Sequence, residues 1–183
     1  MPPPSTSAAA IANGEIAPRG PNLSKGHIAI DDIQSPILQA GLEIWNRTRG
    51  KRPFPSRHDM SPRVLGALLR HTALLKVIED GRDFEFRVIG DGIVMAQGHS
   101  HQGMRVSEIG GINSPLGDEV LRIYRGIVRT QAPAAYRGPI LRPVDHGTLH
   151  RESLLLPLGP AGGGVEYILA VIVYSAHPDM PVH

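Results

Sequence analysis

The sequence contains no cysteine, and aromatic residues make up only 4% of its 183 residues. Without a thiol, the chain can form no disulfide, no thiolate metal site, no cysteine nucleophile and no cysteinyl adduct with a flavin. The shortage of aromatic side chains argues against a stacking surface for single-stranded nucleic acid. These absences exclude several classes of site before any motif is considered.

An excess of charge of one sign is also lacking, since the formal net charge is only +2. That charge is too small for an overall electrostatic surface on DNA, so we expect no DNA partner. One local run of basic residues is present, and we interpret it as solvated surface. It consists of Arg47, Arg49, Lys51, Arg52, Arg57 and Arg63.

Long hydrophobic runs are missing as well. No apolar run approaches the roughly 20 residues that a membrane-spanning helix needs. The N-terminal residues MPPPSTSAAAIANG lack the positively charged start and the apolar core of a secretion signal. We therefore expect no membrane partner and a cytoplasmic location.

What remains is a composition typical of one globular domain, with 41% hydrophobic and 20% charged residues. Residues 1–32 are rich in Pro, Ala, Ser and Gly without sustained periodicity, which predicts a flexible N-terminal tail. Residues 33–176 form the predicted domain. Residues 177–183 are interpreted as a short C-terminal tail.

The pattern over residues 74–90 predicts a β-hairpin. Asp80-Gly81 tolerates positive φ at both central positions of a two-residue turn. That turn pairs Glu79 with Arg82, Val77 with Phe84, Lys76 with Glu85 and Leu75 with Phe86. One face is then apolar while the other carries opposite charges, as expected of antiparallel strands with one buried face.

Three Ser-Pro pairs predict three helices that begin after Ser35, Ser61 and Ser114, because serine can cap free N–H groups and proline fits the first helical position. The first helix is expected to end near Gly50. Three of its residues carry more apolar surface than a free amphipathic helix exposes, so we expect this leading helix to contact a partner or a second copy in a homodimer. They are Leu38, Leu42 and Trp45.

Three further strands are predicted at 134–142, 148–158 and 165–174. The last one is apolar on both faces, so it should be central in the sheet or covered on both sides. Five antiparallel strands with helices between them indicate an α+β domain in which the helices cover one sheet face.

These elements resemble the PAS domain, and more narrowly the stand-alone PAS_5-type family of alphaproteobacteria. The resemblance spans about residues 33–176. It is carried by Trp45, RPFPSRHDMSP at 52–62, FEFRVIG at 84–90, Gly103, and LLLPLG at 154–159.

The resemblance implies a five-stranded antiparallel sheet with a leading helix, and a bacterial sensory or regulatory module for signal transduction. PAS domains bind small ligands or partner PAS domains between the sheet and its helical cover. With seven residues after Ala176, we expect any signal to pass by binding another protein.

The candidate pocket is mostly apolar, although a filled core would explain the same residues because pocket volume cannot be read from sequence. Arg142 is included because an arginine in a strand must reach solvent, pair with an acid, or hold an anion. No cofactor is required by the sequence. The apolar candidates are Val77, Phe86, Val88, Met95, Met104, Ile127 and Ile168.

Catalytic and metal chemistry find weaker support in the sequence. His99 and His101 lack a carboxylate or a helical partner to complete a ligand set, so we expect no metal site. Haem ligation by a lone His71 stays open, although no attachment motif supports it. Ser153 and His150 would face opposite sides of one strand, so no catalytic residues are assigned. The alternative function is a small α+β enzyme that uses His and Asp for acid–base chemistry in the cavity.

Overall fold

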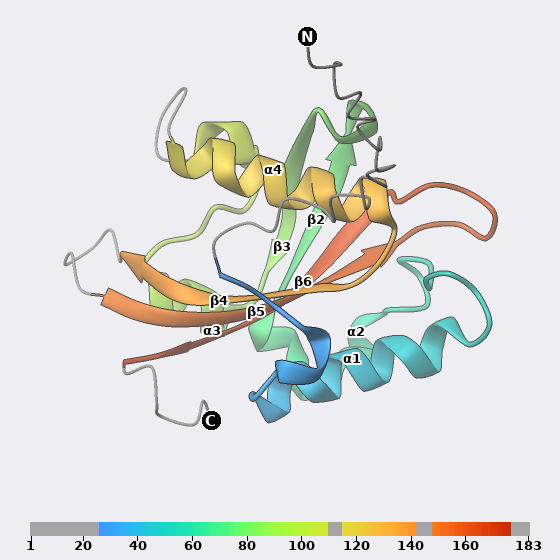
Figure 1. The fold of residues 1–183 in the computed structure, drawn as a ribbon, viewed down its shortest axis with the longest axis horizontal. Helices are drawn as coiled ribbons and strands as arrows, with labels where there is room; N and C mark the ends of the chain where they lie inside the picture. The colour runs from blue at the N-terminus through green and yellow to red at the C-terminus, as the bar shows by residue number, and fades with distance from the viewer. Residues whose placement is uncertain (1–25, 110–114, 142–147, 177–183) are drawn as a thin grey trace, which may run out of the picture.

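An antiparallel sheet of six strands, in the order β1-β4-β5-β6-β2-β3, is the centre of the fold (Figure 1). The computed structural model describes residues 26–109, 115–141 and 148–176. The strands are β1 (His27–Ile28), β2 (Thr72–Ile78), β3 (Asp83–Ile89), β4 (Ala134–Leu141), β5 (Thr148–Leu158) and β6 (Tyr167–Ser175). The predicted class of α+β with an antiparallel sheet is confirmed, with one more strand than expected.

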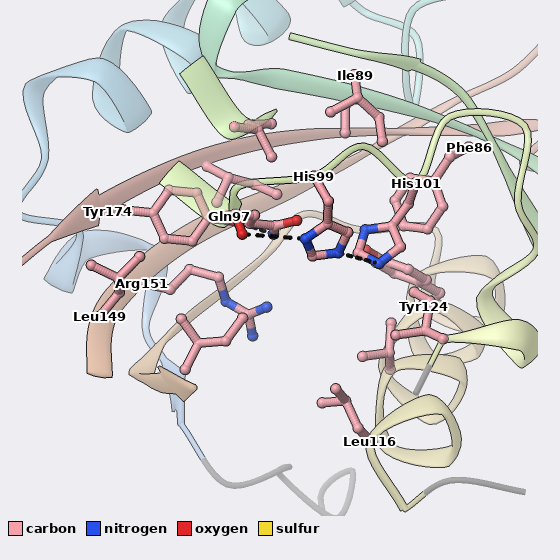
Figure 2. Close-up of a pocket in the computed structure, with 16 residues that line it drawn as sticks. Phe86, Ile89, Gln97, His99, His101, Leu116, Tyr124, Leu149, Arg151 and Tyr174 are labelled. Atoms are coloured by element: carbon pink, nitrogen blue, oxygen red, sulfur yellow. Dashed lines mark hydrogen bonds between the residues drawn. The ribbon is translucent and has the colours of Figure 1, made fainter. Parts of the chain in front are cut away.

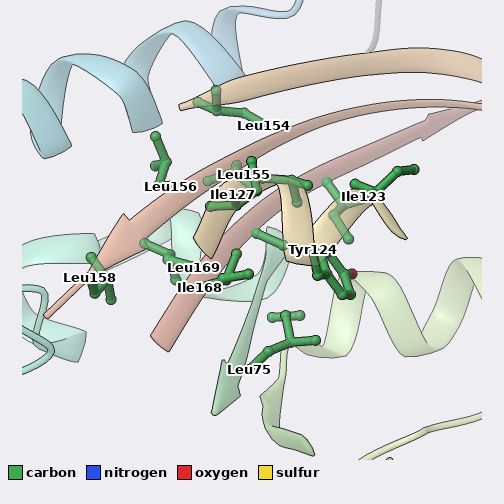
Figure 3. Packing of buried hydrophobic residues seen from close by; sticks show 14 of the residues in the cluster. Leu75, Ile123, Tyr124, Ile127, Leu154, Leu155, Leu156, Leu158, Ile168 and Leu169 are labelled. Atoms are coloured by element: carbon green, nitrogen blue, oxygen red, sulfur yellow. The ribbon is translucent and has the colours of Figure 1, made fainter. Parts of the chain in front are cut away.

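The last strand, β6, lies between β5 and β2 in the middle of the sheet, as its apolar sequence predicts. Its residues from Ile168 to Val173 are all buried. Apolar side chains therefore extend from both faces of β6, and each face needs its own cover. Figure 3 shows the buried side chains packed around β5 and β6.

The predicted hairpin register is confirmed at three pairs, Val77–Phe84, Lys76–Glu85 and Leu75–Phe86. The predicted two-residue turn is wrong. Residues 79–82 form a longer loop with a 3₁₀ turn, in which Glu79, Asp80 and Gly81 all have positive φ. Because the loop holds two extra residues, Glu79 and Arg82 face each other as a surface ion pair instead of a strand pair.

A bulge interrupts the same hairpin between Leu74 and Leu75. Leu75 pairs with Phe86, but Leu74 pairs with Val88, so Arg87 is the additional residue of β3. An extra residue reverses which side chains face the core beyond that point. Val88 accordingly turns away and is 43% exposed, while Ile89 turns inward.

Three helices begin where the Ser-Pro pairs predict, namely α1 (Pro36–Arg49), α2 (Pro62–Leu65) and α4 (Pro115–Thr130). Another helix, α3 (Asp91–Gln97), begins after Gly90 and not after a Ser-Pro pair. The predicted caps are wrong, because neither Ser35 nor Ser61 caps its helix with its side chain. Ser114 lies outside the described residues. Among the described helices, none has the length and apolarity that a membrane crossing requires.

Both faces of the sheet carry helices, which corrects the prediction of cover on one face. In Figure 1, α4 lies on one side of the sheet, and α1 and α2 lie on the other. The indole N–H of Trp45 in α1 donates to the backbone oxygen of Pro157, at 3.0 Å. A Cβ placed on Gly41 would approach the side chain of Val171 to 3.0 Å, so α1 lies very close to β6.

This packing covers the apolar side chains that the sequence assigns to a dimer helix. Leu38 is 0% exposed and Trp45 is 2% exposed, while Leu42 is half-buried. The apolar stripe of α1 is needed to cover the chain's own β5 and β6. The physical basis for assigning these residues to a partner interface is therefore removed.

The sixth strand comes from residues that the sequence places in the N-terminal tail. His27 and Ile28 pair with Tyr136 and Ala135 of β4, and a 3₁₀ turn follows at Ile30–Asp32. Backbone hydrogen bonds at a sheet edge hold this segment, and apolar periodicity does not reveal them. The rest of the predicted tail, residues 1–25, lies outside the described residues, as does the segment 177–183.

A buried carboxylate fixes the entry to α1. Glu152 of β5 accepts hydrogen bonds from the backbone N–H of Gln34, at 3.0 Å, and of Ser35, at 3.2 Å. The guanidinium of Arg137 donates to the same carboxylate at 3.0 Å and also to the backbone oxygen of Asp32. We call this group of contacts the Glu152 anchor.

Candidate ligand-binding cavity

A cavity of about 330 Å³ lies between the sheet and the helices α3 and α4, on the face opposite α1 (Figure 2). Its position follows from strand alternation, since Leu149 and Arg151 of β5 point into it while Glu152 points to the other face. Much of its wall is apolar. The apolar side chains include Ile89, Ile93, Leu116, Val120, Leu149 and Ile172.

Among the described residues, six polar side chains line this cavity. Three follow one another at the end of α3 and in the loop after it, whereas the other three come from α4, β5 and β6. They are Gln97, His99, His101, Tyr124, Arg151 and Tyr174 (Figure 2). Because four separate elements contribute, the group exists only in the folded chain.

Hydrogen bonds order one side of this polar group. The amide of Gln97 donates to the hydroxyl of Tyr174 at 2.6 Å. Nδ1 of His99 lies 3.2 Å from the backbone oxygen of Gln97, and Nε2 of His99 lies 2.9 Å from Nε2 of His101. The ring of His101 also stacks on Phe86, with the ring centroids 5.9 Å apart.

These contacts determine the tautomers of the two histidines. The carbonyl of Gln97 can only accept, so Nδ1 of His99 carries a proton. In a neutral ring, Nε2 of His99 is then an acceptor, and His101 must donate from its own Nε2. A second proton on His99 would place two N–H groups against each other.

Burial, and then the neighbouring His99, lower the pKa of His101 below its usual value. Burial, and then Arg70, lower the pKa of His71 in the same direction. In both cases the unfolded chain binds a proton more readily than the folded chain does. Stability from these residues is therefore present above the ordinary histidine pKa and is lost as the pH falls below it.

We expect the melting temperature of the protein to fall when the pH is lowered from 7.5 to 5.5. In the variant His101→Gln, which cannot take up a proton at this position, the fall should be smaller. Thermal unfolding of both proteins at the two pH values measures the difference in slope. Equal slopes would contradict the assignment of His101 as a buried neutral base.

Tyr124 and Arg151 lie beside this histidine pair. Burial raises the pKa of Tyr124 to about 12, although the nearby Arg151 opposes the rise. The phenol is therefore a neutral hydrogen-bond donor at physiological pH. In Figure 2 the guanidinium of Arg151 points into the cavity. Within the described parts of the chain, this guanidinium has no ion pair and no hydrogen bond.

Of the predicted pocket residues that the structure describes, only Phe86 lines this cavity. Ile127 and Ile168 are fully buried in packed core, where no room for a ligand remains (Figure 3). Val77 lines a separate, more open hollow of about 480 Å³ near the hairpin loop.

The remaining predicted pocket residues lie elsewhere. Val88 faces away, and Met95 is 72% exposed on the outer side of α3. Met104 is half-buried, and its backbone oxygen accepts from the N–H of Phe86. Arg142 lies outside the described residues.

Sequence reasoning missed Arg151, although a signal for it was present. In the predicted strand 148–158, Arg151 shares a face with the apolar Leu149 and Leu155, so a charge lies between apolar side chains. The two histidines were considered only as metal ligands. Among the described residues no group of three or more potential ligands assembles, so His99 and His101 remain a pair.

The family model described as PAS domain, PAS_5, matches residues 33–173. Solved structures of similar fold include the PAS domain of BvgS from Bordetella pertussis, at 13% identity and a TM-score of 0.48 over 66% of this chain and 87% of that chain. The light-state LOV domain of the blue-light photoreceptor Aureochrome1 matches at 13% identity and a TM-score of 0.44, over 66% and 90% of the two chains. A comparison with curated proteins finds no match.

The family match covers well over half of the chain, so the chain belongs to the PAS domain family. PAS domains are generally sensory modules rather than enzymes.

Proposed function

We propose that this PAS domain is a sensor that holds a small molecule in the cavity and passes the signal to a partner protein by direct contact. The observation that carries the proposal is the cavity itself, about 330 Å³ with a polar group at one side of apolar walls. Known ligand pockets have volumes of about 300–1,000 Å³ and the same mixture of apolar walls and few polar groups.

The alternative, an enzyme using His and Asp, finds less support in this site. Acid–base chemistry of that kind needs a carboxylate within hydrogen-bond reach of the histidines. Among the described residues, those that line the cavity include neither Asp nor Glu. We therefore do not assign a reaction, and the absence of enzymatic activity stays a prediction.

The partner surface must lie outside the apolar stripe of α1, which is covered within the chain. Large apolar side chains that remain exposed in the described residues are Val64, Val88, Met95 and Leu116. They are scattered and do not by themselves identify an interface. The homodimer, the protein partner and the cytoplasmic location stay predictions.

Native mass spectrometry of the full chain, purified gently from its own host, tests ligand occupancy. We expect a reproducible additional mass in the wild-type protein. Val120→Trp, which fills the cavity from α4, should lose that mass. The control Val64→Trp, at an exposed position on α2, should retain it.

Two outcomes would contradict the proposal. The first is a wild-type protein that carries only its own mass in repeated preparations. The second is an additional mass that survives in Val120→Trp, because the molecule would then be bound elsewhere on the chain.

A further inference from the structure

The charges in the cavity indicate which chemical class of molecule it takes. We propose that the cavity binds an organic acid in its anionic form, with the carboxylate on Arg151 and an apolar body along the walls. This inference rests on the proposed function, because it names the ligand class of the same site.

Arg151 carries a permanent positive charge, since a guanidinium does not lose its proton in proteins. A histidine or lysine in such a place could become neutral, whereas arginine needs a counter-charge once water is displaced. The side chain of Arg151 is half-buried at the cavity wall. A ligand that closes the cavity would remove much of its remaining water.

Other arginines of the described chain already have such partners. On the opposite face of the sheet, Arg137 pairs with Glu152. Arg52 pairs with Asp59 near the surface, and Arg87 pairs with Glu85. The described residues that line the cavity around Arg151 include no acid, so we expect its counter-charge to come from the ligand.

The neighbouring polar groups also suit an anion. Tyr174 accepts a hydrogen bond from Gln97, which leaves its own proton free to donate. Tyr124 has no hydrogen bond from its hydroxyl within the described residues and can donate as well. Both hydroxyls are close enough to Arg151 for its charge to act on them. Among the described lining residues, a cationic ligand would meet the guanidinium and no carboxylate.

The number of charges favours a carboxylate over a phosphate. A single guanidinium matches one carboxylate with two parallel hydrogen bonds. A phosphate monoester carries close to two negative charges and usually collects more than one cation. The apolar walls, which include Ile89 and Ile172, then require that the rest of the ligand be largely hydrocarbon.

Three probes that differ only in their polar end test this inference on the full chain: octanoate, 1-octanol and octylamine. Isothermal titration calorimetry should show octanoate binding at least roughly tenfold more tightly than 1-octanol, because charge-assisted hydrogen bonds contribute more than neutral ones. Octylamine should bind more weakly than either.

Arg151→Met removes the charge while keeping a long side chain. It should weaken octanoate binding by roughly 10- to 100-fold and leave 1-octanol binding unchanged. Arg151→Lys keeps a charge without the planar fork, so it should recover part of the octanoate affinity. Arg63→Met, at an exposed position of α2, is the matched control and should bind octanoate like the wild type.

The results separate this inference from the proposed function. Equal binding of octanoate and 1-octanol, or octanoate binding unchanged in Arg151→Met, would overturn the anion assignment while leaving a ligand-binding cavity. Absence of octanoate binding up to millimolar concentration would also overturn it. The sensor itself would be removed by the native mass spectra, through a bare wild-type mass or an additional mass that survives in Val120→Trp. The comparison of probes on the wild-type protein stands even where a variant fails to fold.

Discussion

Replacing Glu152 by alanine is expected to lower the free energy of unfolding by about 2–4 kcal/mol. The carboxylate is 6% exposed and accepts from Gln34, Ser35 and Arg137 at once. Its removal leaves two backbone N–H groups without their acceptor and one guanidinium without its partner. The loss should be smaller than that of a fully buried pair because the side chain of Arg137 is 34% exposed.

Thermal unfolding provides the measurement, and we expect a drop of about 5–15 °C for a domain of this size. Glu152→Gln keeps one acceptor oxygen, so its melting temperature should fall less than that of Glu152→Ala. Glu166→Ala, at an exposed residue before β6, is the matched control and should change the melting temperature little. A melting temperature of Glu152→Ala equal to that of the wild type would show that the Glu152 anchor does not hold the N-terminal segment.

Gly90→Ala should lower the free energy of unfolding by a similar amount, for a different reason. A Cβ at residue 90 would lie 2.5 Å from the backbone oxygen of Arg70 and would also overlap the backbone oxygen of Leu69. Neither can give way as a flexible side chain could. The N–H of Gly90 is also held by the oxygen of Thr72, at 2.8 Å. The added Cβ should force the backbone of residue 90 away from that of Leu69 and Arg70. We expect the free energy of unfolding to fall by about 3 kcal/mol as a result.

Because Gly90 directly precedes α3, the same substitution should disturb the cavity wall at Ile93 and weaken octanoate binding. Gly126→Ala in α4 is the control, since a Cβ there meets nothing within 4 Å. That change should be neutral, or stabilising by up to about 1 kcal/mol, because alanine favours helix. Equal melting temperatures of Gly90→Ala and Gly126→Ala would refute the close approach.

The hairpin shows how far sequence reasoning reaches. Opposite charges and a common apolar face are local properties, so they correctly predict the pairs from Val77–Phe84 to Leu75–Phe86. The bulge at Arg87 is not encoded by any glycine or turn signal in that strand. Because of this one unpaired residue, Ile89 and not Val88 lies on the inner face of the strand. The predicted pocket therefore included Val88 and missed Ile89.

The sequence also could not predict what covers the apolar face of α1. Its apolar stripe is evident from spacing, but spacing does not say what covers the stripe. Leu38 and Trp45 could cover the chain's own sheet or a second copy. The apolar character of β6 on both faces offered the clue, because a strand buried on both sides needs cover on the side away from α4.

The site was less predictable than the fold because a cavity forms only where the buried side chains leave space unfilled. Ile127, Ile168 and Leu149 are all apolar residues of the inner face, yet two lie in filled core and one lines the cavity. No local pattern separates them. The strand position of Arg151 could be read from the sequence, since a charge between apolar residues on one strand face needs an explanation.

A crystal structure of the full chain, purified from its own host, tests the central claim most directly. We expect electron density in the cavity for a small acid whose carboxylate lies about 2.7–2.9 Å from the guanidinium of Arg151. The apolar part of the molecule should extend toward Ile89 and Ile172. A cavity that holds only water, or a guanidinium of Arg151 paired with an acid of the chain, would contradict the account.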